Sequence, residues 1–225
     1  MKLLWKEIKS VVDSKDARAI DGLLAMPAFW NSSVDRIFRT GDYLRTTGNL
    51  DKAEWLVELI EGQQSRFTAA EWNTFLFLHG DLLLDQMRYP RAIDCYSQIL
   101  AQEASDKAYN NRGMAYWCLG KYAEALLDYR QAIRLNPENF VAQRGAGEMC
   151  LKLNYFKEAL KCFEAAIRLK ADYPGAYLGR GWTYFHLHRF DEAHANFQRA
   201  LELNPEDWIA KGGVALVKDM LAGEA

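Results

Sequence analysis

The strongest constraint on the fold is an internal repeat in the second half of the sequence. A set of five positions recurs 68 residues later: Tyr109, Gly113, Tyr116, Ala125 and Pro137 return as Tyr177, Gly181, Tyr184, Ala193 and Pro205. Halfway between them lies a weaker copy, formed by Gln143, Gly147, Cys150, Ala159 and Ala171. The period is therefore 34 residues, and a fixed period of this length indicates a stack of similar structural units.

The residues at these positions resemble a known repeat family. Tyr109, Gly113 and Tyr116, followed by Ala125 and Tyr129 and closed by Asn136-Pro137, are similar to the tetratricopeptide repeat, with its pattern W-x2-L-G-x2-Y, A-x3-F and Pro. The resemblance implies an all-α fold, a right-handed α-solenoid of antiparallel helix pairs. It places four units at 73–105, 106–139, 140–173 and 174–207, after a degenerate repeat at 34–72.

The two ends of the chain depart from this pattern. Residues 1–33 carry two apolar stripes at helical spacing, around Ile8 and around Leu23, which predict a divergent helical hairpin packed on the solenoid. Residues 208–225 are predicted to form a capping helix, because Lys211 and Lys218 stand in aromatic positions and give the stack a polar end. We expect all of these parts to form one continuous domain.

Small residues predict how the two helices of each unit approach one another. Glycine inside a helix is less favourable than alanine by about 1 kcal/mol, so Gly113, Gly147 and Gly181 indicate a close approach of the neighbouring helix. The aromatic residues of the second helices fill the space beside them, at Tyr129, Phe163 and Phe197. Arg112 and Arg180 replace the family's Leu, and we expect their aliphatic stems to cover that apolar surface.

Helix ends are also marked in the sequence. Thr68 and Glu71 have the spacing of a capping box, which predicts that a helix begins near Ala69. Gly120 and Asn154 occupy equivalent turns, where a helix ends in a left-handed residue, and His188 stands in the third such turn.

Composition and targeting signals limit the partners. The 28 basic and 30 acidic side chains leave a net charge of −2, which disfavours nucleic acid and anionic membranes as partners. Charges interrupt the apolar residues of the N-terminus, and the most apolar stretch, residues 75–84, is half the length of a membrane span. The four cysteines form no C-x-x-C pair, which fits a reducing cytoplasmic location.

No catalytic or cofactor motif is present in the sequence. His186 and His188 are two residues apart and would point to different helix faces, so no metal site is expected from them. The common phosphate, zinc and serine-nucleophile signatures are missing, and the cysteines are read as core or half-buried thiols. We therefore expect no cofactor and no enzymatic activity.

Residues on the free face of the first helices are predicted to line a concave groove. Those assigned to peptide binding are Phe77, Asp81, Asn110, Met114, Trp117, Arg144, Glu148, Leu151, Leu178, Trp182 and Phe185. Such a surface suits an apolar peptide, bound as a strand or as an amphipathic helix. The alternative is that some of these aromatics pack between units or on a terminal helix. Co-chaperone members of the family hold a C-terminal carboxylate with paired Lys and Asn residues. That pattern is not reproduced in this sequence, since Gly145 and Gly179 stand where such a clamp would need Asn, Lys or Arg.

Two classes of function remain open at this point. The first is a non-enzymatic protein-interaction module, serving as an adaptor, scaffold or dedicated chaperone. The second is a structural subunit that self-associates through exposed aromatics at its ends, such as Trp5, Trp30 and Trp208. The sequence does not name the partner.

Overall fold

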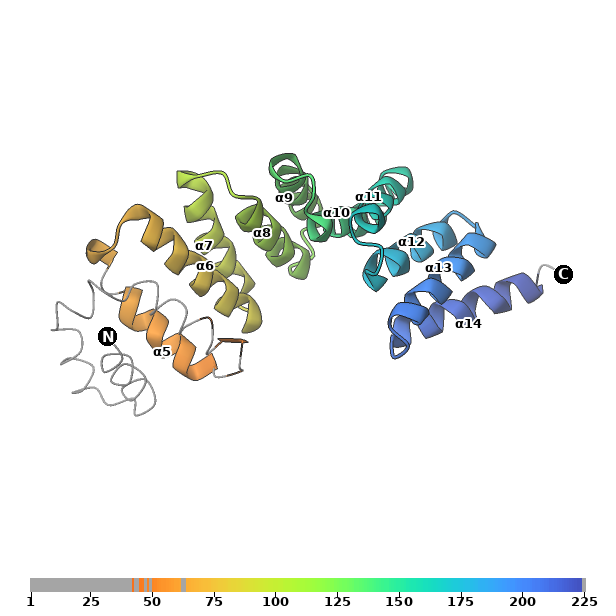
Figure 1. The fold of residues 1–225 in the computed structure, drawn as a ribbon, viewed down its shortest axis with the longest axis horizontal. Helices are drawn as coiled ribbons and strands as arrows, with labels where there is room; N and C mark the ends of the chain where they lie inside the picture. The colour runs from red at the N-terminus through yellow and green to blue at the C-terminus, as the bar shows by residue number, and fades with distance from the viewer. Residues whose placement is uncertain (1–41, 43–44, 47, 49, 62–63, 224–225) are drawn as a thin grey trace. The chain divides into compact units, whose positions relative to one another are not determined.

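The computed structural model describes residues 42, 45–46, 48, 50–61 and 64–223, and within these it is helical with no strand (Figure 1). The hairpin predicted for residues 1–33 lies outside the described residues. The elements are α5 (Leu50–Glu61), η1 (Gln64–Arg66), α6 (Ala69–Asp85), α7 (Tyr89–Gln102), α8 (Asp106–Cys118), α9 (Tyr122–Leu135), α10 (Phe140–Lys152), α11 (Phe156–Leu169), α12 (Pro174–His186), α13 (Phe190–Leu203) and α14 (Trp208–Gly223).

The chain divides into two compact units, Met1–Ile99 and Leu100–Ala225. In the second unit, three helix pairs occupy the three predicted repeats: α8 with α9, α10 with α11, and α12 with α13. The predicted all-α solenoid of helix pairs is confirmed. The expectation of one continuous domain over both units stays a prediction.

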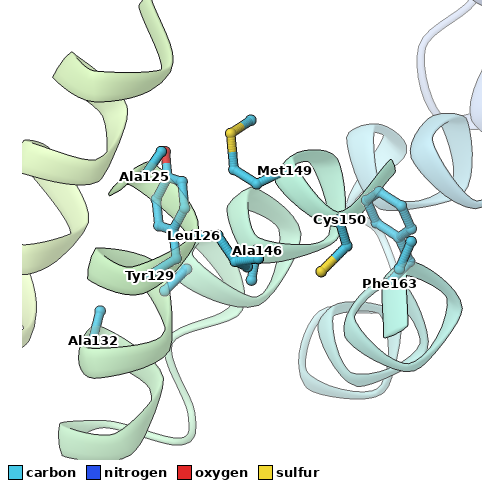
Figure 2. Packing of buried hydrophobic residues seen from close by; sticks show 10 residues of the cluster. Ala125, Leu126, Tyr129, Ala132, Ala146, Met149, Cys150 and Phe163 are labelled. Atoms are coloured by element: carbon cyan, nitrogen blue, oxygen red, sulfur yellow. The ribbon is translucent and has the colours of Figure 1, made fainter. Parts of the chain in front are cut away.

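Three aromatic residues in the second helices of the second unit, Tyr129, Phe163 and Phe197, each lie between two glycines. A Cβ atom added to Gly147 would lie 2.8 Å from Phe163, and one added to Gly179 in the following repeat would lie 2.3 Å from the same ring. Phe163 itself is fully buried, and Figure 2 shows it beside the core of α9 and α10. The glycines therefore admit the ring from both sides, within a repeat and between repeats.

The same arrangement recurs in the neighbouring repeats. Tyr129 lies against Gly113 and Gly145, while Phe197 lies against Gly181 and Gly213. Gly145 and Gly179 are thus buried packing residues, and the sequence interpretation that compared them with groove positions is corrected. Only the glycines within each repeat had been predicted to allow this approach.

Buried alanines explain why the first helices form the inner layer of the second unit. Ala108, Ala142, Ala176 and Ala210 recur at one period and have no exposed surface. Helix α10 packs against both α8 and α12, and α12 packs against α14, whereas successive second helices among those described are not packed to this extent. Because the first helices lie closer together, their side of the stack is the concave one.

The arginines that replace the family's Leu bind polar partners in the second helix. The Arg112 guanidinium donates two hydrogen bonds of 2.8 Å to the buried Asp128 carboxylate. In the third repeat Arg180 Nε donates to Asn196 Oδ1 at 2.8 Å. Covering of the apolar surface by the arginine stems is therefore only part of their role. Each arginine also connects the two helices of its repeat through a hydrogen bond to a buried polar group.

The predicted helix ends agree with the structure. Thr68 and Glu71 form both hydrogen bonds of the capping box at the start of α6. Gly120, Asn154 and His188 have φ angles of 73°, 62° and 56° in the three equivalent turns. His188, the exception to the Gly or Asn of the other two turns, thus adopts the same left-handed conformation.

Replacing Gly179 by Ala should destabilise the second unit by about 1–3 kcal/mol, because the new methyl group overlaps the buried Phe163 ring. Urea unfolding followed by far-UV circular dichroism measures this. Gly212→Ala is the matched control: nothing lies within 4 Å of that added methyl, so the change should be neutral or stabilise the helix by up to about 1 kcal/mol. Equal effects of the two substitutions would contradict the packing argument.

Replacing Arg112 by Leu restores the family's residue but should destabilise the unit by about 2–3 kcal/mol, because Asp128 stays buried without its partner. The double variant Arg112→Leu/Asp128→Leu should recover most of this loss in the same unfolding assay. Arg199→Leu breaks an exposed pair with Glu202 and should change stability by about 0.5 kcal/mol or less.

Candidate peptide-binding site

The candidate site is the concave side of α8, α10, α12 and α14 in the second unit. On α8, Met114 is half-buried and Trp117 is 36% exposed, so both present apolar surface to solvent. Asn110 Nδ2 donates to Asn111 Oδ1 at 3.1 Å, and the Asn110 Oδ1 atom is buried with no partner in the described chain. Leu151 on α10 packs in part against the core formed by α9, α10 and α11.

An ion pair occupies the middle of this side. Arg144 and Glu148, one turn apart on α10, form a salt bridge in which each side chain is about one quarter exposed or less. The Arg144 guanidinium also lies 5.8 Å from the Tyr173 ring, and the missing side chain of Gly175 leaves room for the arginine stem. Burial raises the pKa of the Glu148 carboxyl, an effect that Arg144 opposes. The two predicted residues neutralise each other, so neither is a free charge for a ligand.

The predicted residues on α12 are partly used for packing. Leu178, Trp182 and Phe185 all pack against the buried cluster that includes Phe197 and Val217. The Trp182 ring makes an edge contact with Phe197, with centroids 5.0 Å apart. The alternative noted from the sequence, packing of aromatics on a terminal helix, therefore holds in part for these three residues.

Helix α14 extends the apolar surface beyond the predicted residues. Ile209, Leu216 and Met220 are 38%, 39% and 42% exposed. One repeat period carries Gly175 to Ile209 and Trp182 to Leu216, so the first-helix face continues here, and Met220 lies one turn beyond Leu216. Extending the repeat period by one step predicts these residues as part of the surface, but the sequence pattern of residues 208–225 was interpreted only as a capping helix. Lys211 and Lys218 are exposed as that interpretation expected.

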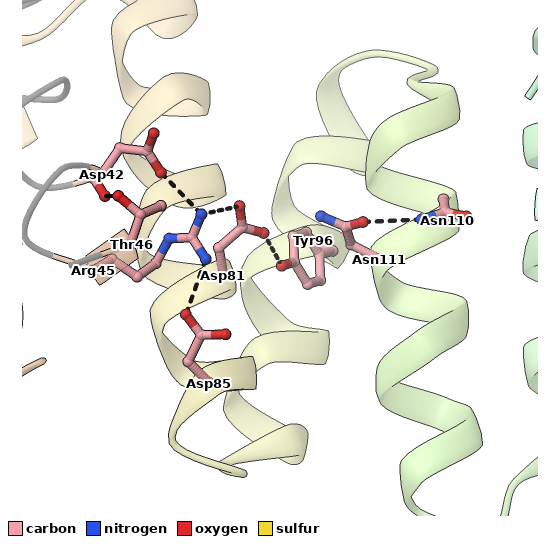
Figure 3. A network of polar contacts seen from close by, with 8 residues as sticks. All are labelled: Asp42, Arg45, Thr46, Asp81, Asp85, Tyr96, Asn110 and Asn111. Carbon is pink, nitrogen blue, oxygen red and sulfur yellow. Dashed lines mark hydrogen bonds and ion pairs between the residues drawn. The ribbon is translucent and has the colours of Figure 1, made fainter. Parts of the chain in front are cut away.

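The remaining predicted residues, Phe77 and Asp81, belong to the first unit. Figure 3 shows the Asp81 carboxylate accepting a 2.6 Å hydrogen bond from the Tyr96 hydroxyl and facing Arg45 Nη2 at 3.9 Å. Arg45 also pairs with Asp42 and Asp85, at 2.9 Å each. The Phe77 ring lies 6.1 Å from Tyr96. Both residues have local structural roles, and their part in peptide binding stays a prediction.

The first unit also contains a polar hollow of about 100 Å³ between α5, α6 and α7. Its lining includes Glu58, Glu61, Arg91 and the buried His79, above a floor of Val57, Leu82 and Leu83. Burial lowers the pKa of His79; Arg91 and Arg88 act in the same direction, while Glu61 and Glu54 oppose it.

Other kinds of site were sought in the same part of the chain. Within the described residues, no group of three or more His, Cys, Asp or Glu side chains is arranged to hold a metal ion. None of the helices described there combines the length and apolar character needed to cross a membrane.

Family comparison agrees with the helix pairs. Residues 106–139 and 174–207 match one tetratricopeptide repeat model, and residues 145–173 match a second. The chain is a tetratricopeptide repeat protein, and its repeats form a protein-interaction module. No curated protein sequence matches the chain.

Solved structures with the same fold include a peptide-bound repeat domain and other repeat proteins. The first tetratricopeptide repeat domain of Spaghetti (RPAP3), bound to the HSP90 peptide SRMEEVD, is 28% identical, with a TM-score of 0.51, over 52% of this chain and 93% of its own. YrrB, with an unusual peptide-binding site, is 18% identical with a TM-score of 0.63, over 92% of this chain and 96% of its own. TTC0263, a thermophilic repeat protein of Thermus thermophilus, is 21% identical with a TM-score of 0.63, over 82% of this chain and 98% of its own.

His79 should make the stability of the first unit depend on pH. Because its pKa is lowered in the folded chain, the unfolded state binds the proton more readily, and stability falls as the pH drops through the ordinary value of 6.5. Hydrogen exchange of the α6 amides at a series of pH values measures this. His79→Gln should remove that component, whereas His186→Gln, at an exposed position in the other unit, should leave it unchanged. An unaltered pH profile in His79→Gln would contradict the assignment.

Proposed function

We propose that the protein is a non-enzymatic adaptor, scaffold or dedicated chaperone that binds an apolar peptide or helix on the concave side of its second unit. The supporting observation is the apolar surface left on the first helices after packing. Trp117, Ile209, Leu216 and Met220 each expose a third or more of their surface there. Water contact with so many large apolar groups is unfavourable, and a partner's apolar side chains would remove it.

The distribution of polar and apolar side chains favours a ligand that is polar at one end and apolar at the other. Polar groups lie toward α8 and α10, where Lys107, Asn110 and Lys152 accompany the Arg144–Glu148 pair. Apolar groups dominate α12 and α14. An extended or helical segment with apolar residues at one end and polar residues at the other would fit both. The Spaghetti domain, which holds an HSP90 peptide, supports peptide binding as the mode of action.

We propose a cytoplasmic location, which the state of the cysteines supports: Cys95, Cys118, Cys150 and Cys162 are all free thiols. Phe77 and Asp81 are retained in the proposal as peptide-binding residues of the first unit.

Substitutions at exposed positions test the binding surface without disturbing the core. Trp182→Ala is unsuitable, because it would open a gap beside Phe197. The double variant Leu216→Glu/Met220→Glu places two carboxylates on the apolar face of α14 and should reduce capture of partners at least tenfold by comparative pull-down and mass spectrometry. Leu127→Glu, at a 62% exposed second-helix position, is the matched control and should keep the partners. Partners retained by the double variant would contradict the proposal.

The second candidate is self-association, which Trp208 supports because it is 78% exposed at the start of α14. Light scattering over a concentration series distinguishes the two. A mass that rises with concentration and falls in Trp208→Ala would favour assembly, and a constant monomer mass would remove it.

A further inference from the structure

Two free cysteines meet inside the middle helix pair. Cys150 on α10 and Cys162 on α11 are free thiols on two helices that pack together, and each thiol shifts the pKa of the other. Cys150 is 1% exposed, and its side chain lies in the core shown in Figure 2, while Cys162 is half-buried against the same cluster. The two sulfurs therefore share one small region of the interior that solvent reaches only on the Cys162 side.

The backbones of α10 and α11 are brought close at this point. Gly147 allows the Phe163 ring to lie against α10, since a Cβ atom there would be 2.8 Å from the ring. Cys150 lies one turn beyond Gly147, and Cys162 directly precedes Phe163. A disulfide requires Cα atoms closer than about 7 Å, a separation that this glycine-mediated approach of two helices favours.

Cys162 occupies a position that holds a polar connection in the flanking repeats, whereas Cys150 stands one period from Tyr116 and Tyr184. Cys162 stands one period from Asp128 and from Asn196, which bind Arg112 and Arg180. In the middle repeat Ala146 replaces the arginine, so the same connection is missing. The two cysteines are the groups left there to join the helices.

The two thiols differ in reactivity. The interaction with the Cys150 thiol lowers the pKa of Cys162, and Arg130 acts in the same direction. The same interaction and burial raise the pKa of Cys150. Cys162 is thus the thiol that is both more acidic and more accessible, which is the pattern of an attacking sulfur with a resolving partner beside it.

We propose that Cys150 and Cys162 form a redox modification site, at which a hydroperoxide converts the two thiols to a disulfide linking α10 and α11. The Cys162 thiolate attacks one peroxide oxygen, the O–O bond breaks, and water or the corresponding alcohol leaves with a cysteine sulfenic acid remaining. The Cys150 sulfur then attacks the sulfenic sulfur, and its proton leaves with the hydroxyl as a second water. A small dithiol restores both thiols by exchange. The bridge restrains the helix that carries Arg144, Glu148 and Leu151.

The test uses the full chain with Cys95→Ala and Cys118→Ser, so that only the two thiols of interest remain. Cys95 is a suitable residue to remove, since burial raises the pKa of its thiol to about 12. After treatment with hydrogen peroxide, we expect a mass loss of about 2 Da, reversed by dithiothreitol, and a non-reduced peptide that joins α10 to α11. Urea unfolding should shift to higher denaturant in the oxidised form.

Single variants separate the bridge from other oxidation. Cys150→Ser in the same background should gain oxygen at Cys162 and show no mass loss and no shift in unfolding. Circular dichroism of the reduced variants shows whether they fold. Three outcomes would each overturn the proposal. The first is formation of sulfinic acid at Cys162 while Cys150 is present, and the second is a disulfide that forms only between molecules. The third is that both thiols stay unchanged at peroxide levels that oxidise the exposed Cys118 of the natural sequence.

Discussion

The second unit depends on the contact between an aromatic ring and two glycines. Phe163 is held by Gly147 from its own repeat and by Gly179 from the next, so one ring joins two levels of packing. Glycine in a helix sacrifices about 1 kcal/mol of helix propensity, and the buried ring offsets that loss through close packing. Because the contact repeats with the chain period, the inner layer of first helices follows from it, and so does the surface those helices leave free.

Several features of this arrangement were predictable from one sequence. The period placed the helix pairs, the capping box placed the start of α6, and the left-handed turns were expected at Gly120 and Asn154. The packing of Gly145 and Gly179 against the aromatic ring of the preceding repeat was not predictable. A pattern within one unit carries no information about which neighbouring side chain fills the space beside a glycine. The Arg112–Asp128 pair was missed for a similar reason: each residue is ordinary alone, and only their proximity shows that they bind.

Which residues bind a peptide stays a prediction, and the packing of several of them could not be read from the sequence for a physical reason. Spacing identifies which side chains leave the packed face, but it does not say how far a large ring folds back. Trp182 turns toward Phe197, whereas Trp117 stays partly exposed, although both occupy first-helix positions. Arg144 and Glu148 were expected as separate ligand contacts, yet their spacing of four residues allows them to satisfy one another. The apolar face of α14 was predictable by extending the period one step further.

The buried polar pairs have a consequence for how the repeats find their correct partners. In a chain with one repeating pattern, a first helix fits the second helix of its own repeat and of the next almost equally well. If α8 took α11 as its hairpin partner, Arg112 would meet Cys162, and Asp128 would be left without its arginine. Each mismatch buries a charge without its counter-charge, which is strongly unfavourable. The alternation of charged, thiol and amide connections along the stack therefore disfavours errors of register that the shared glycines and aromatics would tolerate.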